Sequence, residues 1–334
     1  MHTFIIAELS GNHGGKLQTA LDSVHAMKDA GADAIKIQTY TADTITLNCR
    51  RPEFIAGDLW KGENLYDLYK KAYTPWEWHK DIFEEAAKIG LTCFSTPFDP
   101  TAVDLLESLG NPIYKIASFE ITDIPLIEYV ASKHKPMIIS AGVAMAEDIE
   151  LALDACNRCG NDDVTLLKCT SSYPAPIEDA NLLTIPDMKS RFGCRVGISD
   201  HTPGSDVAVA AVAIGAEVVE KHFIIDRSIG GPDSEFSMTA PEFTAMVKSI
   251  RNVEKALGKI SYPTDISKIK GRNYSRSLYV AEKMKKGDMI TSKNVRSVRP
   301  SNGLHPKYWK DIVGKTVNRD LDFGEPMRLE YVNV

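Results

Sequence analysis

The sequence predicts an α/β protein built as a (β/α)8 TIM barrel, followed by a small β-rich domain. Three observations predict it. Eight short apolar runs recur up to residue 223, amphipathic stretches with helical spacing separate most of them, and the pattern changes after residue 258. Strands that alternate with amphipathic helices form parallel sheets, and eight such units over roughly 250 residues match the size of a barrel.

The predicted elements follow one another in regular order. The strands are expected at residues 3–9, 33–40, 91–96, 113–117, 136–140, 164–170, 195–199 and 217–223. Helices are expected at residues 17–32, 76–90, 100–110, 124–134, 146–160 and 206–216, several of which end at glycine, the usual residue after a helix. An open doubly wound sheet is the alternative, but GNHGG at 11–15 lacks the GxGxxG spacing typical of its first turn.

The domain organisation follows from the change of pattern. Residues 1–258 form the predicted barrel domain. Residues 259–275 are polar and lack sustained periodicity, which predicts a linker. Residues 276–334 contain short β runs with Lys-Gly and Phe-Gly turns, and we expect a compact β-rich domain there.

The composition excludes several classes of protein. The 334 residues carry a net charge of −6, which argues against a dedicated nucleic-acid binder, since phosphate neutralisation needs a clustered basic excess. No apolar run approaches the roughly 18 residues that a membrane span requires, and the start, MHTFIIAELS, lacks the features of a signal peptide. The six cysteines form no regular framework, as expected of reduced thiols. We therefore expect a cytoplasmic protein with no membrane or nucleic-acid partner.

Polar side chains follow the predicted strands at their C-terminal ends, where barrels carry their active sites. Charges inside a barrel are costly unless they are paired or bound to a ligand, so we expect one site built from all eight ends. The polar residues there are Glu8, Asn12, His13, Lys36, Gln38, Ser95, Thr96, Lys115, Ser118, Glu120, Ser140, Lys168, Thr170, Ser171, Ser199, Asp200, His201, Glu220, Lys221 and His222.

Two histidines end successive strands. His201 follows the seventh run and His222 lies in the eighth, and neighbouring strand ends are about 5 Å apart, so the two imidazoles are expected to share one cation. Imidazole ligands suit Mn2+, Fe2+, Co2+ or Zn2+ better than Ca2+, and a substrate oxygen would complete the shell. Asp200 and Glu220 would then support the imidazoles or move protons. The alternative is a pair of hydrogen-bonded histidines without a metal.

Lysines and hydroxyl groups gather at the same ends. Ammonium and hydroxyl groups together form a cradle for a small phosphorylated and carboxylated molecule. The residues expected in it are Lys36, Lys115, Lys168, Ser95, Thr96, Ser118, Ser140, Ser171 and Ser199. Two alternatives are that the hydroxyls cap the following helices and that a lysine forms a Schiff base.

Motifs along the whole chain carry a resemblance to a known family. The sequence resembles the sialic acid synthase family, bacterial enzymes that condense phosphoenolpyruvate with an acylamino sugar to make nine-carbon nonulosonic acids. Within it, LYDLYKKAYTPWEW, YKIASFEITDIPLI and GGPDSEFSM are most similar to the pseudaminic acid synthase branch, which uses 2,4-diacetamido-2,4,6-trideoxy-L-altrose. The other matching motifs are IAELSGNH, DAIKIQTY, FSTPFD, IISAG, LLKCTSSYPAP, GISDHTPG, EKHF, RSLYVAEKMKKGDMI and RPSNGLHPKYW.

The resemblance implies an architecture and a cofactor. The C-terminal domain would have the SAF fold, similar to type III antifreeze proteins, and would cover the active site of the partner barrel in a homodimer. His201 and His222 would hold a divalent metal, Mn2+ or Mg2+.

The resemblance also implies roles for individual residues. Those implied to bind phosphoenolpyruvate are Lys36, Thr96, Lys115, Ser118, Ser140, Ser171 and Ser199, those implied as catalytic are Glu8, Glu120 and Glu220, and those implied to bind the sugar are Gln38, Tyr173, Asp233 and Arg299. Arg299 would come from the other subunit. Ser171 departs from the family pattern, because neuraminate synthases often show CTN where this chain has CTS.

Several functions remain as alternatives at this point. Within the family, the chain is also compatible with an N-acetylneuraminate or legionaminate synthase, because residues 41–64 contain no motif that identifies the sugar. Outside it, the alternatives are a Schiff-base keto-acid aldolase and a non-catalytic carbohydrate or ice binder built on the C-terminal domain. The second of these leaves the polar strand ends without a purpose.

Overall fold

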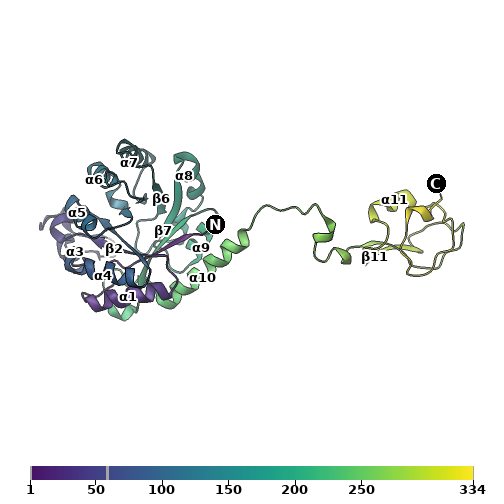
Figure 1. Ribbon diagram of the computed structural model, residues 1–334, viewed down its shortest axis with the longest axis horizontal. Coiled ribbons are helices and arrows are strands. Elements are labelled where there is room, and N and C mark those ends of the chain that lie inside the picture. Colours follow the sequence, from purple (N-terminus) through teal and green to yellow (C-terminus); the bar gives the residue numbers. More distant parts are fainter. Residues whose placement is uncertain (1, 58–59, 334) are drawn as a thin grey trace. The chain divides into compact units, whose positions relative to one another are not determined.

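The first of two compact units is a closed barrel of parallel strands. The computed structural model describes residues 2–57 and 60–333, and it divides between Gly258 and Lys259. Neighbouring strands pair in sequence order, and β1 pairs with β8 to close the barrel. Figure 1 labels β2, β6 and β7 among the surrounding helices. The strands are β1 Phe4–Glu8, β2 Ala34–Thr39, β3 Thr92–Pro97, β4 Tyr114–Ile116, β5 Met137–Ser140, β6 Val164–Cys169, β7 Arg195–Asp200 and β8 Val218–Ile224. The predicted (β/α)8 barrel is confirmed.

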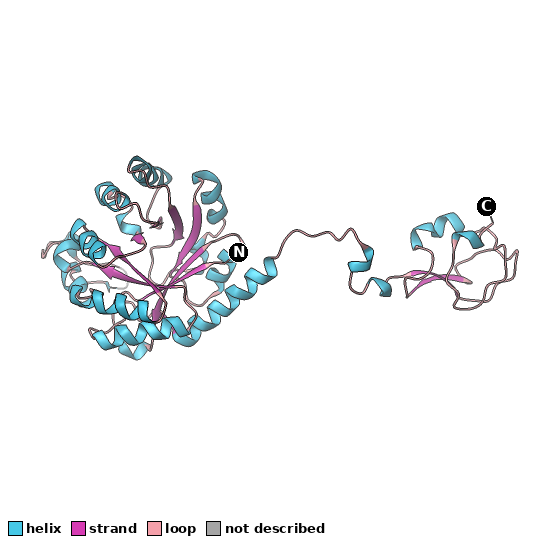
Figure 2. Cartoon of the chain, in the orientation of Figure 1, coloured by secondary structure: helices cyan, strands magenta, loops and turns pink. Residues whose placement is uncertain are grey.

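Helices enclose these strands, and Figure 2 shows them in cyan around the magenta strands. The six predicted helices correspond to α1 Leu17–Asp29, α4 Trp76–Lys88, α5 Pro100–Ser108, α6 Ile124–Ala131, α7 Ala146–Arg158 and α9 Asp206–Ala213. Four further helices were not predicted, namely α2 Ala42–Ile45, α3 Leu65–Ala72, α8 Thr184–Phe192 and α10 Ala240–Leu257. In the described residues, no helix combines the length and apolar character needed to cross a membrane.

Local chemistry explains where individual helices begin. Helix α5 follows β3 through Asp99, whose carboxylate accepts from the backbone N–H groups of Thr101 and Ala102. Pro100 occupies the first turn, where its missing N–H costs nothing. Helix α6 begins in the same way, because the Asp123 carboxylate accepts from Leu126 N. These caps fix where the loops end and the two helices begin.

The interior of the barrel is apolar at one level and polar at the next. An apolar cluster of inward-facing side chains comprises Ile6, Ala34, Phe94, Ile138, Leu167 and Val218. Because side chains alternate across a strand, the residues two positions further on face the same interior. Those residues are Glu8, Lys36, Thr96, Ser140, Cys169 and Glu220. The apolar layer therefore forms a floor beneath a polar layer at the C-terminal ends of the strands.

Gly197 is the residue of β7 at the level of the apolar layer, and its lack of a side chain leaves room for the neighbouring residues. A Cβ atom there would lie 2.7 Å from Val218 Cβ and 2.8 Å from Leu167 Cδ2, which is closer than real side chains approach. The missing side chain lets two large neighbours fill the interior instead. Ser199, two residues later, is consequently the first interior side chain of β7 above the floor.

The second unit has a small core of its own. Strands β10 Ser277–Val280 and β11 Val295–Val298 pair antiparallel. The short helices are η6 Ile266–Lys268, η7 Arg272–Tyr274, η8 Pro306–Tyr308, α11 Trp309–Ile312 and η9 Leu329–Tyr331. The buried cluster comprises Leu278, Val280, Met284, Ile290, Val295, Ile312, Val317, Leu321 and Met327. This β-rich unit agrees with the expected character of the C-terminal region.

Candidate active site

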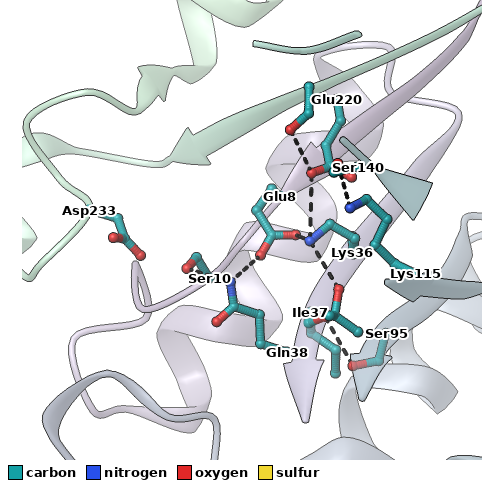
Figure 3. Close-up of polar contacts among 12 residues, drawn as sticks. Glu8, Ser10, Lys36, Ile37, Gln38, Ser95, Lys115, Ser140, Glu220 and Asp233 are labelled. Carbon is teal, nitrogen blue, oxygen red and sulfur yellow. Dashed lines mark hydrogen bonds and ion pairs between the residues drawn. The ribbon is translucent and has the colours of Figure 1, made fainter. Parts of the chain in front are cut away.

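Lys36 lies at the centre of the polar layer. Its Nζ is 2.6 Å from Glu8 Oε2 and 3.7 Å from Glu220 Oε1, and it donates to Thr96 Oγ1 at 3.3 Å (Figure 3). Ser199 Oγ donates to Glu220 Oε1 at 3.1 Å. Strands β1, β2, β3, β7 and β8 thus contribute to one buried ionic cluster.

Two carboxylates share this single ammonium group, and their pKa values shift in opposite directions. Burial raises the pKa of Glu8 to about 7, although the positive charge of Lys36 opposes the shift. Burial acts in the same direction on Glu220, but Lys36 and Lys115 outweigh it and hold the pKa of Glu220 below its ordinary value. For Lys36, burial lowers the pKa, and the two carboxylates more than compensate and raise it. The cluster can therefore take up or release a proton near neutral pH.

A second ammonium group belongs to Lys115 on β4. Its Nζ donates to Ser140 Oγ at 2.7 Å and to the carbonyl of Ile116 at 2.9 Å. Burial lowers the pKa of Lys115 despite the nearby Glu220. Figure 3 shows Lys115 and Ser140 beside the Glu8–Lys36–Glu220 cluster. Two of the predicted anion-binding lysines thus lie together.

Two of the predicted serines form a pair next to this cluster. Ser171 Oγ donates to Ser118 Oγ at 2.9 Å, and Ser118 Oγ accepts from Val143 N at 3.0 Å. Gly142 makes room for the pair, because a Cβ at this position would collide with Ser171 Oγ and lie 2.8 Å from Ser118 Oγ. The sequence reading assigned no role to Gly142.

The imidazoles of His201, which directly follows β7, and His222, which lies in β8, are neighbours, with ring centroids 5.3 Å apart and ring planes inclined by 59°. His201 Nδ1 lies 2.9 Å from the carbonyl of Thr170. In the neutral imidazole, donation from Nδ1 leaves Nε2 with a lone pair, which is the form that binds a metal. Burial lowers the pKa of His222 well below its ordinary value, and His222 Nδ1 is buried with no hydrogen-bond partner among the described residues.

These features fit a divalent cation held by few protein ligands. Within residues 2–57 and 60–333, no group of three His, Cys, Asp or Glu side chains could hold a metal ion. Two imidazoles alone leave most positions of a coordination shell open, so water or substrate oxygens would complete it. The donor set therefore suits a catalytic ion more than a structural one.

Aromatic rings surround the two imidazoles. Tyr173 lies over His201 with centroids 4.4 Å apart, and Phe236 lies 5.0 Å from His222. Trp60 packs on Tyr173 at 5.6 Å and donates from Nε1 to the carbonyl of Pro232. Tyr173 was predicted near the sugar, whereas Trp60 and Phe236 were missed, although Phe236 lies in the quoted motif GGPDSEFSM.

A cavity of about 340 Å³ opens onto this region. Its polar lining includes Gln38, Glu120, Ser171, Tyr173, His222 and Asp233, and its apolar lining includes Tyr40, Ile45, Leu65, Leu68, Tyr69 and Phe98. Much of the apolar lining comes from the segment with α2 and α3, between β2 and α4. The cavity is large enough for a small molecule and offers it one polar and one apolar environment.

The carboxylates in the cavity lining have different partners. Asp233 Oδ2 accepts from Gly11 N at 3.2 Å, and Gln38 Nε2 donates to Glu8 Oε1 and Ser10 Oγ at 3.1 Å. Burial raises the pKa of Glu120 to about 7, although Lys115 opposes the shift. Glu120 Oε2 is buried and has no hydrogen-bond partner in the described chain. Glu120 is thus a carboxyl group poised to exchange a proton near neutral pH.

The structure does not bring every predicted cradle residue to the cluster. Lys168 Nζ donates to Cys169 O and Thr170 Oγ1 and lines a small crevice with Ala180 and Val207. Since Cys169 faces the interior, alternation turns Lys168 towards the helices.

Ser95 faces the helices for the same reason. Its Oγ lies 2.6 Å from Thr39 Oγ1 and donates to the carbonyl of Ile37. These two residues were wrongly expected in the cradle. Arg299 belongs to the C-terminal unit, where it is exposed.

Comparison with known proteins agrees with this geometry. The SAF domain profile matches residues 275–330, and the NeuB family profile matches residues 23–262. A pseudaminic acid synthase of Campylobacter jejuni is 47% identical over 97% of this chain and 95% of its own length. An N,N'-diacetyllegionaminic acid synthase of the same species is 35% identical, over 98% of this chain and 99% of its own.

A solved structure extends the comparison to three dimensions. The N-acetylneuraminic acid synthetase of Leptospira borgpetersenii superposes with a TM-score of 0.72 and 34% identity, covering 80% of this chain and 89% of that one. The family profile covers most of the chain, and the relatives span nearly all of it. The chain therefore belongs to the NeuB family.

Proposed function

We propose that the protein is a pseudaminic acid synthase, which condenses phosphoenolpyruvate with 2,4-diacetamido-2,4,6-trideoxy-L-altrose and releases phosphate. The observation that carries the proposal is the combination of two buried lysines, two neighbouring imidazoles and a small-molecule cavity at one end of the barrel. The identity to the Campylobacter jejuni synthase supports the same reaction.

Phosphoenolpyruvate binds at the lysine cluster. Lys36 and Lys115 neutralise its carboxylate and phosphate, and the hydroxyls of Thr96 and Ser140, which accept from these lysines, donate hydrogen bonds to them. Ser199 adds a donor when its hydroxyl turns from Glu220 to the substrate. The proximity of Lys36, Thr96, Lys115 and Ser140 to one another supports this role. Ser171, which lines the cavity, and its hydrogen-bond partner Ser118 extend the donor set.

The sugar aldehyde lies next to His201 and His222. These imidazoles would hold a Mn2+ or Mg2+ ion, which would supply Lewis-acid polarisation of the aldehyde oxygen when bound. Gln38, Tyr173 and Asp233 line the same cavity and orient the sugar hydroxyls and acetamido groups. Holding both substrates in contact removes most of the entropic barrier to their reaction.

Carbon–carbon bond formation joins C3 of phosphoenolpyruvate to the aldehyde carbon. The alkoxide that forms takes up a proton, and water adds at C2 to give a tetrahedral intermediate that expels phosphate. Glu120, with its pKa near 7 and its position in the cavity lining, is suited to proton transfer. Glu8 and Glu220 hold Lys36 in place and stabilise positive charge that develops at C2.

The apolar lining supports the choice of sugar. A 6-deoxy sugar with two acetamido groups presents three methyl groups, whereas N-acetylmannosamine presents one methyl and a hydroxymethyl group. Leu65, Leu68 and Phe98 offer no hydrogen bond to a hydroxyl group, so burying one there would be unfavourable. The lower identity to the legionaminic acid synthase supports the same choice.

The assembly and location complete the proposal. The protein forms a homodimer in which the C-terminal domain of one subunit covers the active site of the other, and Arg299 contributes from that domain. Residues 259–275 connect the two domains as a linker. Phosphoenolpyruvate is a cytoplasmic metabolite, which supports a cytoplasmic location.

A phosphate-release assay tests the proposal. Phosphoenolpyruvate is mixed with 2,4-diacetamido-2,4,6-trideoxy-L-altrose, its legionaminate-series counterpart or N-acetylmannosamine, in the presence of Mn2+. We expect release only with both substrates present and the highest kcat/KM with the first sugar. A higher kcat/KM with another sugar would overturn the choice of branch, and trapping of pyruvate by borohydride would indicate a Schiff-base aldolase instead.

A further inference from the structure

A buried ion pair lies behind the two imidazoles. Asp200 is the last residue of β7, and its Cα pairs with that of Lys221 on β8. The Asp200 side chain is fully buried, and that of Lys221 is 1% exposed. Since Ser199 and Glu220 bond to each other inside the barrel, alternation turns Asp200 and Lys221 to the opposite side of the wall.

The pair holds the residues on both sides of His201. Lys221 Nζ is 2.7 Å from Asp200 Oδ2 and donates to the carbonyl of Thr202 at 2.6 Å. Asp200 Oδ1 accepts from Thr202 N at 2.9 Å and from Thr202 Oγ1 at 2.7 Å. His201 is therefore flanked by two anchored residues, and His222 directly follows the lysine that anchors them.

Stability alone does not account for this arrangement. A buried ion pair gains little over apolar side chains of similar size, because both charges lose their water. Hydrogen bonds from charged groups, however, impose directions that apolar contacts do not. Here the directions converge on the turn that carries His201.

We propose that Asp200 and Lys221 form a positioning pair that sets the separation of the His201 and His222 imidazoles and so the affinity for the divalent cation. This inference rests on the proposed function, in which those imidazoles are the metal ligands. The pair touches neither substrate nor metal. It acts by fixing Thr202 to β8, so that the loop after β7 cannot move His201 away from His222.

The test measures Mn2+ binding to the full-length protein by electron paramagnetic resonance, together with the melting temperature Tm. The variants are Lys221→Met, Asp200→Asn and Thr202→Val, of which the last removes one hydroxyl donor and keeps the size of the side chain. We expect the Kd for Mn2+ to rise at least tenfold for Lys221→Met and Asp200→Asn, and less for Thr202→Val.

A matched control separates positioning from general stability. Arg251 forms a 2.7 Å ion pair with Asp33, which directly precedes β2 at the amino-terminal end of the barrel. Arg251→Met is expected to lower Tm without changing the Kd for Mn2+. If Lys221→Met proves insoluble, Asp200→Asn and Thr202→Val carry the comparison.

The outcomes distinguish the positioning role of the pair from the assignment of the metal ligands. Wild-type protein that binds Mn2+, with unchanged Kd in the soluble variants of the pair, would overturn the positioning role alone. Wild-type protein that binds no Mn2+ would overturn the ligand assignment and this inference with it. A raised Kd in the pair variants and not in Arg251→Met supports the positioning role.

Discussion

Lys36 and Glu8 are register partners on neighbouring strands, and 2.6 Å separate Lys36 Nζ from Glu8 Oε2 inside the barrel. Both side chains are almost completely buried. Removing one partner of a buried ion pair is costly because the remaining charge loses its compensation. The contact therefore links the stability of the barrel to its chemistry.

The first prediction separates these two roles of Lys36. Lys36→Met leaves Glu8 and Glu220 without their shared cation, and we expect about 3–5 kcal/mol of destabilisation and a loss of phosphate release. Adding Glu8→Gln removes one of the two carboxylates that have lost their cation, so Tm should recover in part while activity should not. Thermal unfolding and the phosphate assay check both. A Lys36→Met variant with wild-type activity would contradict the account.

The second prediction concerns Glu120 and pH. Because burial raises its pKa from 4.5 to about 7, the folded protein retains a proton that the unfolded chain releases between these values. Stability therefore falls as pH rises through this window. Glu120→Gln should be more stable than wild type at pH 8, by at most about 3 kcal/mol, and nearly equal at pH 5.

Thermal melts at both pH values check this prediction, with Glu178→Gln, an exposed site, as the control. The control should show no such pH-dependent gain. An equal effect of Glu120→Gln at pH 5 and pH 8 would mean that the carboxyl group does not titrate in this range.

The third prediction concerns the space beside Gly142. Gly142→Ala would push its Cβ into the Ser118–Ser171 pair, so we expect a loss of about 1–3 kcal/mol and a raised KM for phosphoenolpyruvate. Adding Ser171→Gly removes the nearest obstacle and should restore part of the stability. Steady-state kinetics and thermal melts measure both effects. If neither the stability nor the KM changes, the Ser118 and Ser171 side chains can move aside without a loss of stability or of substrate binding.

The fourth prediction concerns the proposed dimer. If Arg299 acts on the partner's active site, mixing an Arg299→Ala chain with a His222→Ala chain should restore activity, because one site of the mixed dimer is then complete. Each variant alone should be inactive or weakly active. Phosphate release after subunit exchange is the measurement. Exchange without recovery would count against sharing of the site.

Much of the fold could be predicted because strands and helices differ in the period of their apolar residues. All eight barrel strands were found within one or two residues. Helix α10 was missed although Phe243, Met246, Val247 and Ile250 follow helical spacing and Thr239 and Glu242 form a capping box. Its signal was present in the sequence. Helix α3 spans only eight residues, which is shorter than the window over which helical periodicity is read from a sequence.

The candidate site could be predicted only in part. The strand ends that carry Lys36, Lys115, His201 and His222 were recognised because barrels collect chemistry there. Side-chain direction was not read correctly for Ser95 and Lys168, since a period of two gives alternation but not which face is inside. The cavity lining from α2 and α3 and the rings of Trp60 and Phe236 depend on tertiary packing, which no local pattern encodes.

The most direct test of the account is the binding of Mn2+ to wild-type protein and to His201→Ala and His222→Ala, measured alongside phosphate release. The assignment of these imidazoles as the metal ligands predicts one Mn2+ per wild-type chain, loss of binding and turnover in both variants, and a circular dichroism spectrum unchanged from wild type. Variants that still bind Mn2+ and retain the wild-type kcat would contradict it.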